Sequence, residues 1–284
     1  MLTRNRMGTI LDGKAIAERI KEDIQRELAK TVRRPTLAIL SFQNPASKAY
    51  RRAQEREAAS LLIGVTGGPP LSIQATQETV EHAIEEWNRD GRIHGIFVHQ
   101  PLPPQIDPQR VSASIDPQKD VEGIHPQNSA RRFFARARIG SCTALAVMEL
   151  IESTGVNLEG KEAVVVGHSE IVGRPVSMLL LDKLATTTVC HVATKNLRSH
   201  VERADVLIVA VGKPQFIHGA WIKEGAIVID VGINVVHGRV VGDVEFETAR
   251  ARAAFISPVP GGVGPVTVMM VMKNTVEAFK LQMG

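Results

Sequence analysis

The sequence is poor in cysteine, in aromatic residues and in known metal-binding patterns. Its 284 residues include two cysteines, Cys142 and Cys190, and 4% aromatic residues, with a single tyrosine. Two distant cysteines exclude a disulfide-rich secreted scaffold and provide no zinc or redox motif. The nine histidines form no HExxH pattern, so a zinc hydrolase has no support. We therefore expect a protein of the reducing cytoplasm without a metal site.

Long apolar runs and concentrated charge are also missing. No stretch reaches the roughly 18 uninterrupted apolar residues of a membrane span, and the first twenty residues lack the apolar region of a signal peptide. The net charge of +4 and the pI near 9.2 are mildly basic, but Lys and Arg are scattered among 30 acidic residues. The sequence thus predicts no membrane and no nucleic acid among its partners.

Short apolar runs alternate with amphipathic stretches, which is typical of α/β units. In the first half we expect, in order, a helix over 13–30, a strand over 36–42, a helix from 45, a helix over 78–90, a strand over 93–98 and loop-rich segments between 104 and 140. In the second half we expect strand, turn and helix over 162–181, strands within 186–192, 204–212, 225–232 and 253–262, and a final helix from Pro265.

The second half follows the outline of a dinucleotide-binding domain. We therefore predict an α/β fold of two domains. The first, over residues 1–140, carries the C-terminal helix 266–284 packed back on it. The second, over residues 141–265, is a Rossmann-type, doubly wound domain.

The only tyrosine lies in "NPASKAYRRAQ", residues 44–54. Asn44 can cap a helix and the following proline fits its first turn. Ser47, Tyr50 and Gln54 are three and four residues apart, so they share one helix face. From these residues alone, that face is either a site or an ordinary helix surface with a half-buried ring.

The turn "GHSEIVGRP" follows an apolar strand and places Gly167 and Gly173 six residues apart. Glycines at a strand-to-helix turn let the backbone approach a pyrophosphate at the helix N-terminus. The spacing is not GxGxxG, so a plain structural turn is equally compatible with these residues. Ser169 can bond a phosphate or cap the next turn.

Two further loops carry chemistry. "SPVPGGVGPVT", residues 257–267, combines three glycines with three prolines in a rigid loop whose backbone can approach a ligand closely, unless it is only a domain crossover. "KDVEGIHP" places Asp120 and Glu122 in a loop. A loop carboxylate is usually solvated, but one held against an aminopyrimidinone ring can accept two N–H bonds from it.

Nine segments resemble, in the same order, the bifunctional methylenetetrahydrofolate dehydrogenase/cyclohydrolase family. They are "NPASKAY", "GIFVHQPLPP", "DPQKDVEGIHPQN", "GHSEIVGRPVS", "TKNL", "ADVLIVAVGKP", "IKEGAIVIDVGIN", "VVGDVEF" and "SPVPGGVGPVT". The resemblance covers nearly the whole chain, and "PVPGGVGP" with "GxSxxVGRP" is highly specific in combination. It implies a homodimeric enzyme that binds tetrahydrofolate derivatives in a cleft between its two domains. Such an enzyme oxidises 5,10-methylenetetrahydrofolate with a nicotinamide cofactor and hydrolyses the methenyl product to 10-formyltetrahydrofolate.

The resemblance also implies roles for individual residues. The catalytic positions are Tyr50, Gln54, His99 and Asp120, with Asp120 on the amino edge of the pterin. The substrate-binding positions are Ser47, Val98, Gln100, Pro260, Gly261, Gly262, Val263 and Gly264. The cofactor-binding positions are Gly167, His168, Ser169, Gly173, Arg174 and Ile233.

The sequence departs from the family pattern at two partnered positions. Gln54 stands where the pattern Ser-x-x-Tyr-x-x-x-Lys has its catalytic lysine, and His99 replaces the glutamine that usually partners it. An amide can orient water but has no usable pKa near 7, whereas neutral histidine can act as a base. Hydrolysis therefore either uses His99 or is lost, while hydride transfer depends chiefly on positioning.

Smaller departures concern the pterin loop and the cofactor. Glu122 replaces the usual aspartate. The position of a basic residue in NADP-dependent relatives is Val192, but Arg174 and Lys195 can meet a 2′-phosphate, so we expect NADP ahead of NAD. The alternatives are a dehydrogenase without cyclohydrolase activity and a non-catalytic folate-binding paralogue.

Overall fold

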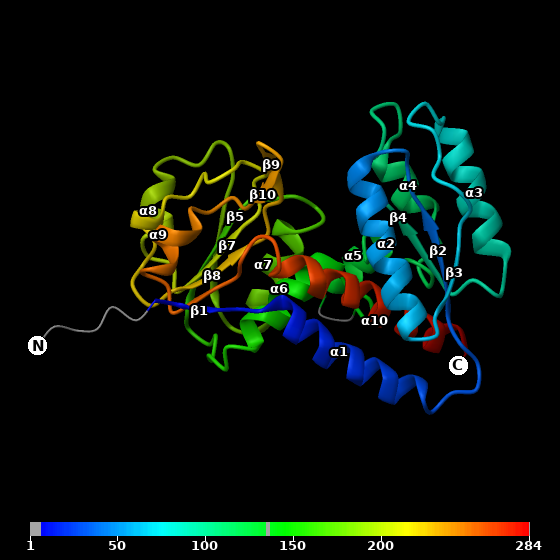
Figure 1. Ribbon diagram of the computed structural model, residues 1–284, viewed down its shortest axis with the longest axis horizontal. Helices are drawn as coiled ribbons and strands as arrows, with labels where there is room; N and C mark the ends of the chain where they lie inside the picture. Colours follow the sequence, from blue (N-terminus) through cyan, green and yellow to red (C-terminus); the bar gives the residue numbers. More distant parts are fainter. Residues whose placement is uncertain (1–6, 135–136, 284) are drawn as a thin grey trace, which may run out of the picture. The chain divides into compact units, whose positions relative to one another are not determined.

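The chain folds into two compact units, each built around a parallel sheet. The computed structural model describes residues 7–134 and 137–283 (Figure 1). We call Arg19–Cys142, with the residues from Val268 on, the first unit. The second unit comprises the residues up to Glu18 and Thr143–Thr267.

The first unit contains a three-stranded parallel sheet in the order β3-β2-β4. The strands are β3 (Gly64–Thr66), β2 (Thr36–Leu40) and β4 (Gly95–Val98). β4 is buried throughout and β2 almost so, because helices cover both faces of the sheet.

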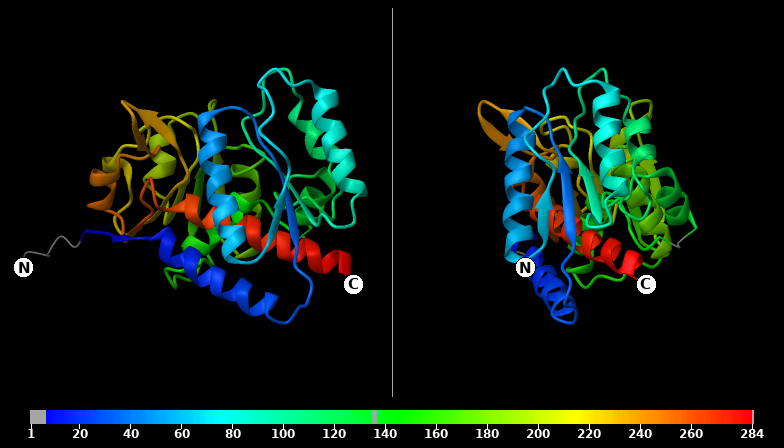
Figure 2. Two further views of the ribbon diagram at one scale, coloured as in Figure 1. Left: turned by 45° about the vertical axis from the view of Figure 1, so that its right-hand side comes forward. Right: turned by 90° about the vertical axis from the view of Figure 1, so that its right-hand side faces the viewer.

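Alternation along the strands decides which helix each side chain meets. Ile96 and Val98 join a core with α3 (Gln77–Arg89) and α4 (Pro108–Ser114). Phe97, between them, points to the opposite face, where its ring meets Tyr50 of α2 (Pro45–Ser60). The right-hand view of Figure 2 shows α2 on one side of this sheet and α3 on the other. His99, two residues beyond Phe97, is therefore directed towards α2.

Three more helices contribute to the first unit. α5 (Pro126–Phe133) lies within it, whereas α1 (Gly13–Leu28) and α10 (Val263–Met283) begin in the second unit and end in the first. Asn274 of α10 donates hydrogen bonds to the carbonyls of Val121 and Gly140, at 2.8 and 2.9 Å. The C-terminal helix therefore packs on the first unit, as predicted.

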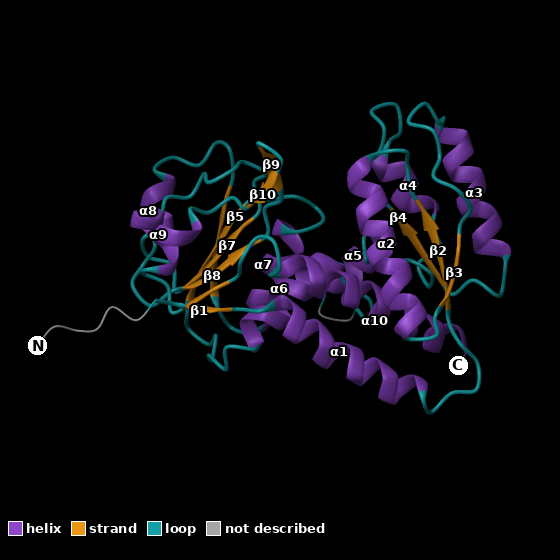
Figure 3. Cartoon of the chain, viewed as in Figure 1, coloured by secondary structure: helices purple, strands orange, loops and turns teal. Residues whose placement is uncertain are grey.

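The second unit contains a six-stranded parallel sheet in the order β1-β11-β8-β7-β5-β6. Figure 3 labels β1, β8, β7 and β5 of this sheet. Its strands are β1 (Thr9–Ile10), β11 (Phe255–Ile256), β8 (Ile227–Asp230), β7 (Val206–Val209), β5 (Glu162–Val166) and β6 (Thr186–Cys190). The chain runs outward from β5 to β6 and then returns to β7 on the other side. This reversal creates a switch point between β5 and β7, where doubly wound sheets bind ligands at the carboxyl ends of their strands.

Short helices cover this sheet. α7 (Gly173–Asp182) packs against β5 and β6, and α6 (Cys142–Glu152) precedes β5. A core on one face includes residues of α8 (Leu197–Val201), the 3₁₀ turn Gly219–Trp221 and α9 (Phe246–Arg250). An antiparallel hairpin, β9 (Asn234–Val236) and β10 (Arg239–Val241), follows β8.

The predicted α/β class and the predicted long elements are confirmed, and three details differ. The segment between 104 and 140 contains α4 and α5, two short helices that begin at prolines. Residues 9–10 form an edge strand of the second unit, although they precede the predicted boundary at 140. The hairpin β9–β10 was not predicted, because its strands are three residues long and largely exposed.

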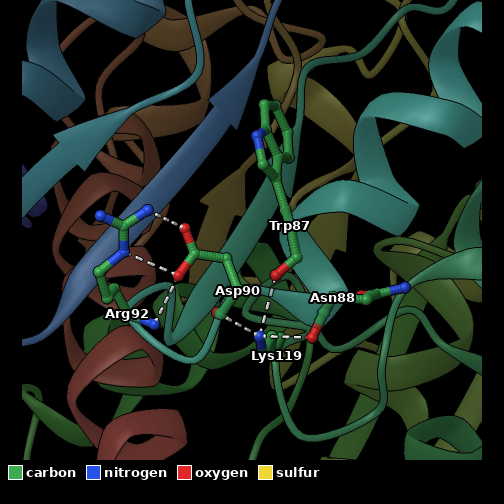
Figure 4. A network of polar contacts seen from close by, with 5 residues as sticks. All are labelled: Trp87, Asn88, Asp90, Arg92 and Lys119. Carbon is green, nitrogen blue, oxygen red and sulfur yellow. Dashed lines mark hydrogen bonds and ion pairs between the residues drawn. The ribbon is translucent and has the colours of Figure 1, made fainter.

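Lys119 fastens the loop after α4 to the end of α3 (Figure 4). Its buried ammonium donates to the carbonyls of Trp87, Asn88 and Asp90 at 2.9, 2.8 and 2.9 Å. Trp87 and Asn88 belong to the last turn of α3 and Asp90 is its C-cap residue, so the ammonium lies at a helix end where a positive charge is favourable. The backbone of Lys119 accepts from Ile96 of β4 at 2.7 Å. Lys119 therefore fixes one end of the segment that carries Asp120 and Glu122.

We expect Lys119→Met to lower the free energy of unfolding by about 2–3 kcal/mol, because it keeps the apolar stem but removes the ammonium donor from the carbonyls of Trp87, Asn88 and Asp90, of which that of Asp90 keeps its bond from the Ile93 backbone. Chemical denaturation followed by circular dichroism measures this change. Lys30→Met, at an exposed lysine, is the control and should change stability by less than about 0.5 kcal/mol. Equal effects of the two substitutions would contradict the role of Lys119.

Candidate active site

The start of α2 is fixed by a side-chain cap. The carboxamide oxygen of Asn44 accepts from the Ser47 backbone N–H at 2.8 Å, and its nitrogen donates to Ser47 Oγ at 3.1 Å. This cap sets the rotation of the helix and hence the face that carries Tyr50 and Gln54. Ser47 is buried and takes part in the cap. Its contact with substrate stays a prediction.

Tyr50 lies partly buried against β4. Its ring centroid is 6.0 Å from that of Phe97 and 5.4 Å from that of His99. Burial, and secondarily the nearby Cys142 and Glu122, raise the pKa of Tyr50 well above its ordinary value. The phenol therefore stays protonated at neutral pH and can donate a hydrogen bond.

Gln54 and His99 form a buried pair. Their side chains are 0% and 1% exposed, and Gln54 Oε1 lies 2.7 Å from His99 Nε2. Burial, and then the positive charge of Arg51, lower the pKa of His99 to about 4. Within the described residues, Gln54 Nε2 and His99 Nδ1 have no hydrogen-bond partner. The two departures from the family pattern thus contact each other directly.

Asp120 holds the loop rather than presenting a free carboxylate. Its Oδ1 accepts from the backbone N–H groups of Gly123 and Ile124, at 3.0 and 3.3 Å. Its Oδ2 accepts from the backbone of His125 and the amide of Asn128, at 2.8 and 2.9 Å. These four bonds occupy both oxygens of a side chain that is 0% exposed. The structure thus shows Asp120 anchoring its loop, and its predicted contact with a pterin stays a prediction.

Glu122, two residues later, has a carboxyl oxygen that can still accept a hydrogen bond. It is buried, and its Oε2 has no hydrogen-bond partner among residues 7–134 and 137–283. Burial, and then the charge of Asp120, raise the pKa of Glu122 to about 8. A buried carboxyl with an unpaired oxygen is suited to a ligand that brings N–H donors. The role that we expected of Asp120 is therefore better matched by Glu122.

Side chains from two other elements support this loop. The thiol of Cys142 donates to the carbonyl of Val121 at 3.1 Å, and Asn274 Nδ2 donates to the same carbonyl and approaches Cys142 Sγ at 3.3 Å. Burial, and then Glu122 and Asp120, raise the pKa of Cys142 well above its ordinary value, so the thiol stays protonated. Neither supporting residue was predicted, because Cys142 and Asn274 lie far from the loop in sequence.

Val98 and Gln100 flank His99 but differ in environment. The side chain of Val98 belongs to the core formed with α3 and α4, so only its main chain could meet a ligand. Gln100 is partly buried, and its side-chain oxygen accepts from the backbone of Leu102 at 3.3 Å. The Gln100–Pro101 peptide bond is cis. The predicted substrate contacts of Val98 and Gln100 stay predictions, and that of Val98 would use its main chain.

The glycine turn of the second unit lies at the switch point of its sheet. Gly167 follows β5 and Gly173 begins α7. A Cβ atom on Gly173 would lie 2.1 Å from the carbonyl oxygen of Gly167, so only glycine fits there. Ser169 Oγ accepts from the backbone of Val172 at 3.2 Å. Within the described chain, no side chain caps the start of α7. The turn therefore suits a pyrophosphate at the helix N-terminus.

The other predicted cofactor residues surround this turn or lie at neighbouring strand ends. His168 is exposed, and its ring centroid lies 5.4 Å from that of His191, which follows β6. Arg174 is exposed and pairs with Glu170 at 3.2 Å. Ile233, after β8, is 70% exposed. Dehydrogenases that use NAD have a carboxylate near the position of His191, so its absence from "CHVATKN" favours NADP.

The glycine-proline loop belongs to the second unit. Residues 257–262 connect β11 to α10, whose first residues are Val263 and Gly264, and the Val259–Pro260 peptide bond is cis. The backbone N–H of Gly13 donates to the carbonyl of Gly261 at 2.9 Å. A Cβ atom on Gly13 would lie 1.8 Å from the carbonyl oxygen of Gly262, so the start of α1 holds this loop at close range. The predicted substrate residues are thus divided between the two units.

The described residues contain neither a metal-binding cluster nor a membrane-spanning helix. Over 7–134 and 137–283, no three His, Cys, Asp or Glu side chains are grouped so that they could hold a metal ion. No helix within the same ranges has the length and apolar character needed to cross a membrane.

Because the pKa of Glu122 is raised, the free energy of unfolding should depend on pH. An unfolded glutamate loses its proton near its ordinary pKa of 4.5, whereas the pKa of Glu122 in the folded protein is about 8. Glu122 therefore costs stability progressively as pH rises from about 4.5 to 8. We expect Glu122→Gln to remove this dependence and to raise the free energy of unfolding by roughly 5 kcal/mol at pH 9, with little change at pH 4.

Denaturation by guanidinium chloride at several pH values measures this effect. Glu22→Gln, at an exposed glutamate of α1, is the matched control and should follow the wild-type curve. Parallel curves for Glu122→Gln and wild type across the pH range would contradict the buried, protonated state of Glu122.

Two family models together match most of the chain. Residues 11–122 match the tetrahydrofolate dehydrogenase/cyclohydrolase catalytic domain, and residues 141–283 match the NAD(P)-binding domain of the same family. The bifunctional protein FolD of Halothermothrix orenii is 46% identical over 281 residues, covering 96% of this chain and 99% of its own length. That of Geotalea daltonii is 46% identical over 280 residues, with coverage of 96% and 99%.

Solved structures agree with these matches. The bifunctional FolD of Campylobacter jejuni has a TM-score of 0.91 at 39% identity, covering 96% of this chain and 99% of its own. The Trypanosoma brucei enzyme, complexed with NADP and an inhibitor, has a TM-score of 0.92 at 38% identity, with coverage of 98% and 99%. The chain therefore belongs to the tetrahydrofolate dehydrogenase/cyclohydrolase family.

Proposed function

We propose that this protein oxidises 5,10-methylenetetrahydrofolate with NADP and hydrolyses the 5,10-methenyl product to 10-formyltetrahydrofolate. The observation that carries the proposal is the unpaired, buried carboxyl of Glu122 beside Tyr50, in a chain with a nucleotide turn. Family membership supports both reactions. The relatives that match almost the full length are described as bifunctional.

Glu122 is our candidate for recognition of the pterin. A pterin presents two adjacent N–H donors on its aminopyrimidinone ring, and a carboxylate can accept both in a bidentate arrangement. Without ligand, burial keeps Glu122 largely protonated at pH 7, because its pKa is about 8. Two N–H donors would stabilise its ionised form and lower that pKa. Binding of folate would then release a proton from the protein.

Tyr50, Gln54 and His99 are our candidates for the reacting end of the folate. Hydride loss leaves positive charge on the methylene carbon and its flanking nitrogens, and bound NADP supplies the hydride acceptor. The Gln54–His99 pair is neutral at pH 7, so it does not oppose that charge as an ammonium group would. The protonated phenol of Tyr50 can hold a substrate oxygen or nitrogen by donation. Positioning of the two rings then provides much of the catalysis.

NADP fits the turn between β5 and α7. The Gly167–Gly173 contact leaves room for backbone approach, and the start of α7 favours an anion. His168 and Arg174 are exposed beside the turn and offer nitrogen donors to a phosphate. The Trypanosoma brucei relative is complexed with NADP, which supports the same cofactor here.

Three further proposals concern organisation. Residues 1–140 and helix 266–284 form the folate-binding domain, except that strand β1 pairs with β11 in the sheet of the other domain. Residues 141–265 form the NADP-binding domain.

The protein forms a homodimer, since Val235 and Val240 leave apolar surface exposed on the hairpin. It works in the cytoplasm, where both of its free, buried cysteines would stay reduced.

The first test mixes the purified protein with 5,10-methylenetetrahydrofolate and NADP and follows the absorbance of NADPH. We expect turnover with NADP to exceed turnover with NAD. Glu122→Gln should lower kcat/KM for the folate about 30-fold or more, because an amide cannot accept both pterin N–H bonds. Folate binding without reduction of either cofactor would contradict the proposal and identify a non-catalytic paralogue.

The nucleotide turn gives a separate prediction. Gly173→Ala should weaken NADP binding by more than about tenfold, because the new methyl group collides with the Gly167 carbonyl and displaces the turn. Fluorescence titration with NADPH measures the dissociation constant. Gly91→Ala is the control, since Gly91 has open space around its Cβ position. Undiminished affinity in Gly173→Ala would place the cofactor elsewhere.

A further inference from the structure

The Gln54–His99 contact fixes the protonation of the histidine ring. Gln54 Oε1 can only accept a hydrogen bond, so His99 Nε2, 2.7 Å away, must carry the proton. In the neutral ring, Nδ1 then bears the lone pair. The glutamine therefore selects one tautomer of His99 and leaves a defined basic atom.

Nδ1 is buried and unused. The histidine is 1% exposed, and Nδ1 has no partner in the part of the chain that the structure describes. A buried polar atom without a partner costs roughly 1–3 kcal/mol, which is an unusual cost in a folded core. The unpaired N–H of Gln54 incurs a similar cost. A ligand or a water that donates to Nδ1 would remove part of this penalty.

The groups around His99 keep it neutral. Arg51 and Tyr50 of α2 face it, together with the apolar ring of Phe97 on β4. Arg51 is itself held by Glu55 at 2.8 Å, by Ser41 Oγ at 2.9 Å and by the carbonyl of Gly68 at 2.8 Å. This arrangement keeps its positive charge near the ring, and with burial it holds the pKa of His99 at about 4. His99 is thus in its basic form throughout the neutral range.

We propose that His99 is the base of the hydrolytic reaction, with Nδ1 taking a proton from the attacking water, and that Gln54 is the residue that positions it. The proposal rests on the proposed function, since it concerns hydrolysis of the methenyl product. In this protein the neutral Gln54–His99 pair then stands in place of the lysine of the family pattern, and His99 is the base. The carrying observation is that His99 Nδ1 has no partner while Gln54 fixes the tautomer. A pair of two amides would offer no basic nitrogen, and a histidine with a purely structural role would have both ring nitrogens hydrogen-bonded.

Hydrolysis of the methenyl cation takes two steps. Water oxygen bonds to the cationic methenyl carbon while one water proton passes to Nδ1, which gives a hydroxyl adduct and an imidazolium. The bond from that carbon to N5 then breaks, N5 receives the proton from Nδ1, and the hydroxyl proton leaves to solvent. Net, the methenyl cation and water give 10-formyltetrahydrofolate and one proton. A base of low pKa suffices because the cationic carbon makes the attacking water strongly acidic. Positive charge moves from substrate to ring in the first step, so the site's total charge stays constant.

The test compares hydrolysis of 5,10-methenyltetrahydrofolate with NADP-linked oxidation in the same protein. Hydrolysis is followed by loss of methenyl absorbance above the uncatalysed rate. We expect His99→Gln to lower the ratio of hydrolysis to oxidation about 100-fold. His82→Gln, at an exposed histidine of α3, should leave the ratio unchanged. The double variant Gln54→Lys/His99→Gln restores the family pair and should regain hydrolysis.

Two variants of Gln54 test the positioning role. Gln54→Leu removes the acceptor, so the tautomer is no longer fixed and the ratio should fall about tenfold. Gln54→Glu keeps an acceptor for Nε2–H and adds negative charge, so hydrolysis should persist while its acid limb moves from near pH 4 to higher pH. A purely structural contact would not move the pH profile in this direction.

The outcomes are distinguishable. If wild type does not reduce NADP, the proposed function fails. If it reduces NADP but hydrolyses no faster than the uncatalysed rate, the proposed oxidation stands, and the hydrolytic part of the proposed function fails together with the role of His99. Hydrolysis that survives in His99→Gln would also overturn that role. Full hydrolysis in Gln54→Leu would overturn the positioning by Gln54.

Discussion

The carboxylate of Asp120 is the interaction on which the candidate site depends. Its four hydrogen bonds gather the backbone of residues 123–125 and the side chain of Asn128 around one buried charge. The desolvation of that charge is offset only because every acceptor position is filled. The same loop is tied to α3 by Lys119 and to α10 by Asn274. Glu122 is therefore presented by a segment that is anchored on three sides.

The long elements were predictable, and the reasons are physical. Continuous apolar runs such as "EAVVV" and "VLIV" belong to strands buried on both faces, and the amphipathic stretches gave α1 and α3 nearly to the residue. Short elements were not predictable. α4 and α5 begin at prolines within polar sequence, and strand β1 exists only because residues 9–10 pair with β11, far away in the chain. A pairing between strands that are distant in the chain produces no recognisable pattern in the local sequence.

The candidate site was predicted in part. The shared face of Tyr50 and Gln54 followed from helical spacing, but their contact with His99 required the register of β4 against α2. Asp120 and Glu122 could not be distinguished, because both are loop carboxylates separated by one residue. Their environments differ only through tertiary partners: four donors surround the first, and the second is left with an unpaired oxygen. The hydrogen-bond partners of buried groups, which the sequence alone does not reveal, distinguish Asp120, which holds the loop, from Glu122, our candidate for recognition of the pterin.

The distribution of thiols has a practical consequence. Cys142 belongs to the first unit and Cys190 to the second, and both are buried as free thiols. Neither can react with an alkylating reagent until its surroundings open. The protein therefore carries one built-in chemical reporter in each unit. The two alkylation rates, resolved by peptide mass, would show whether the units open together or separately and which of them a bound folate or NADP protects.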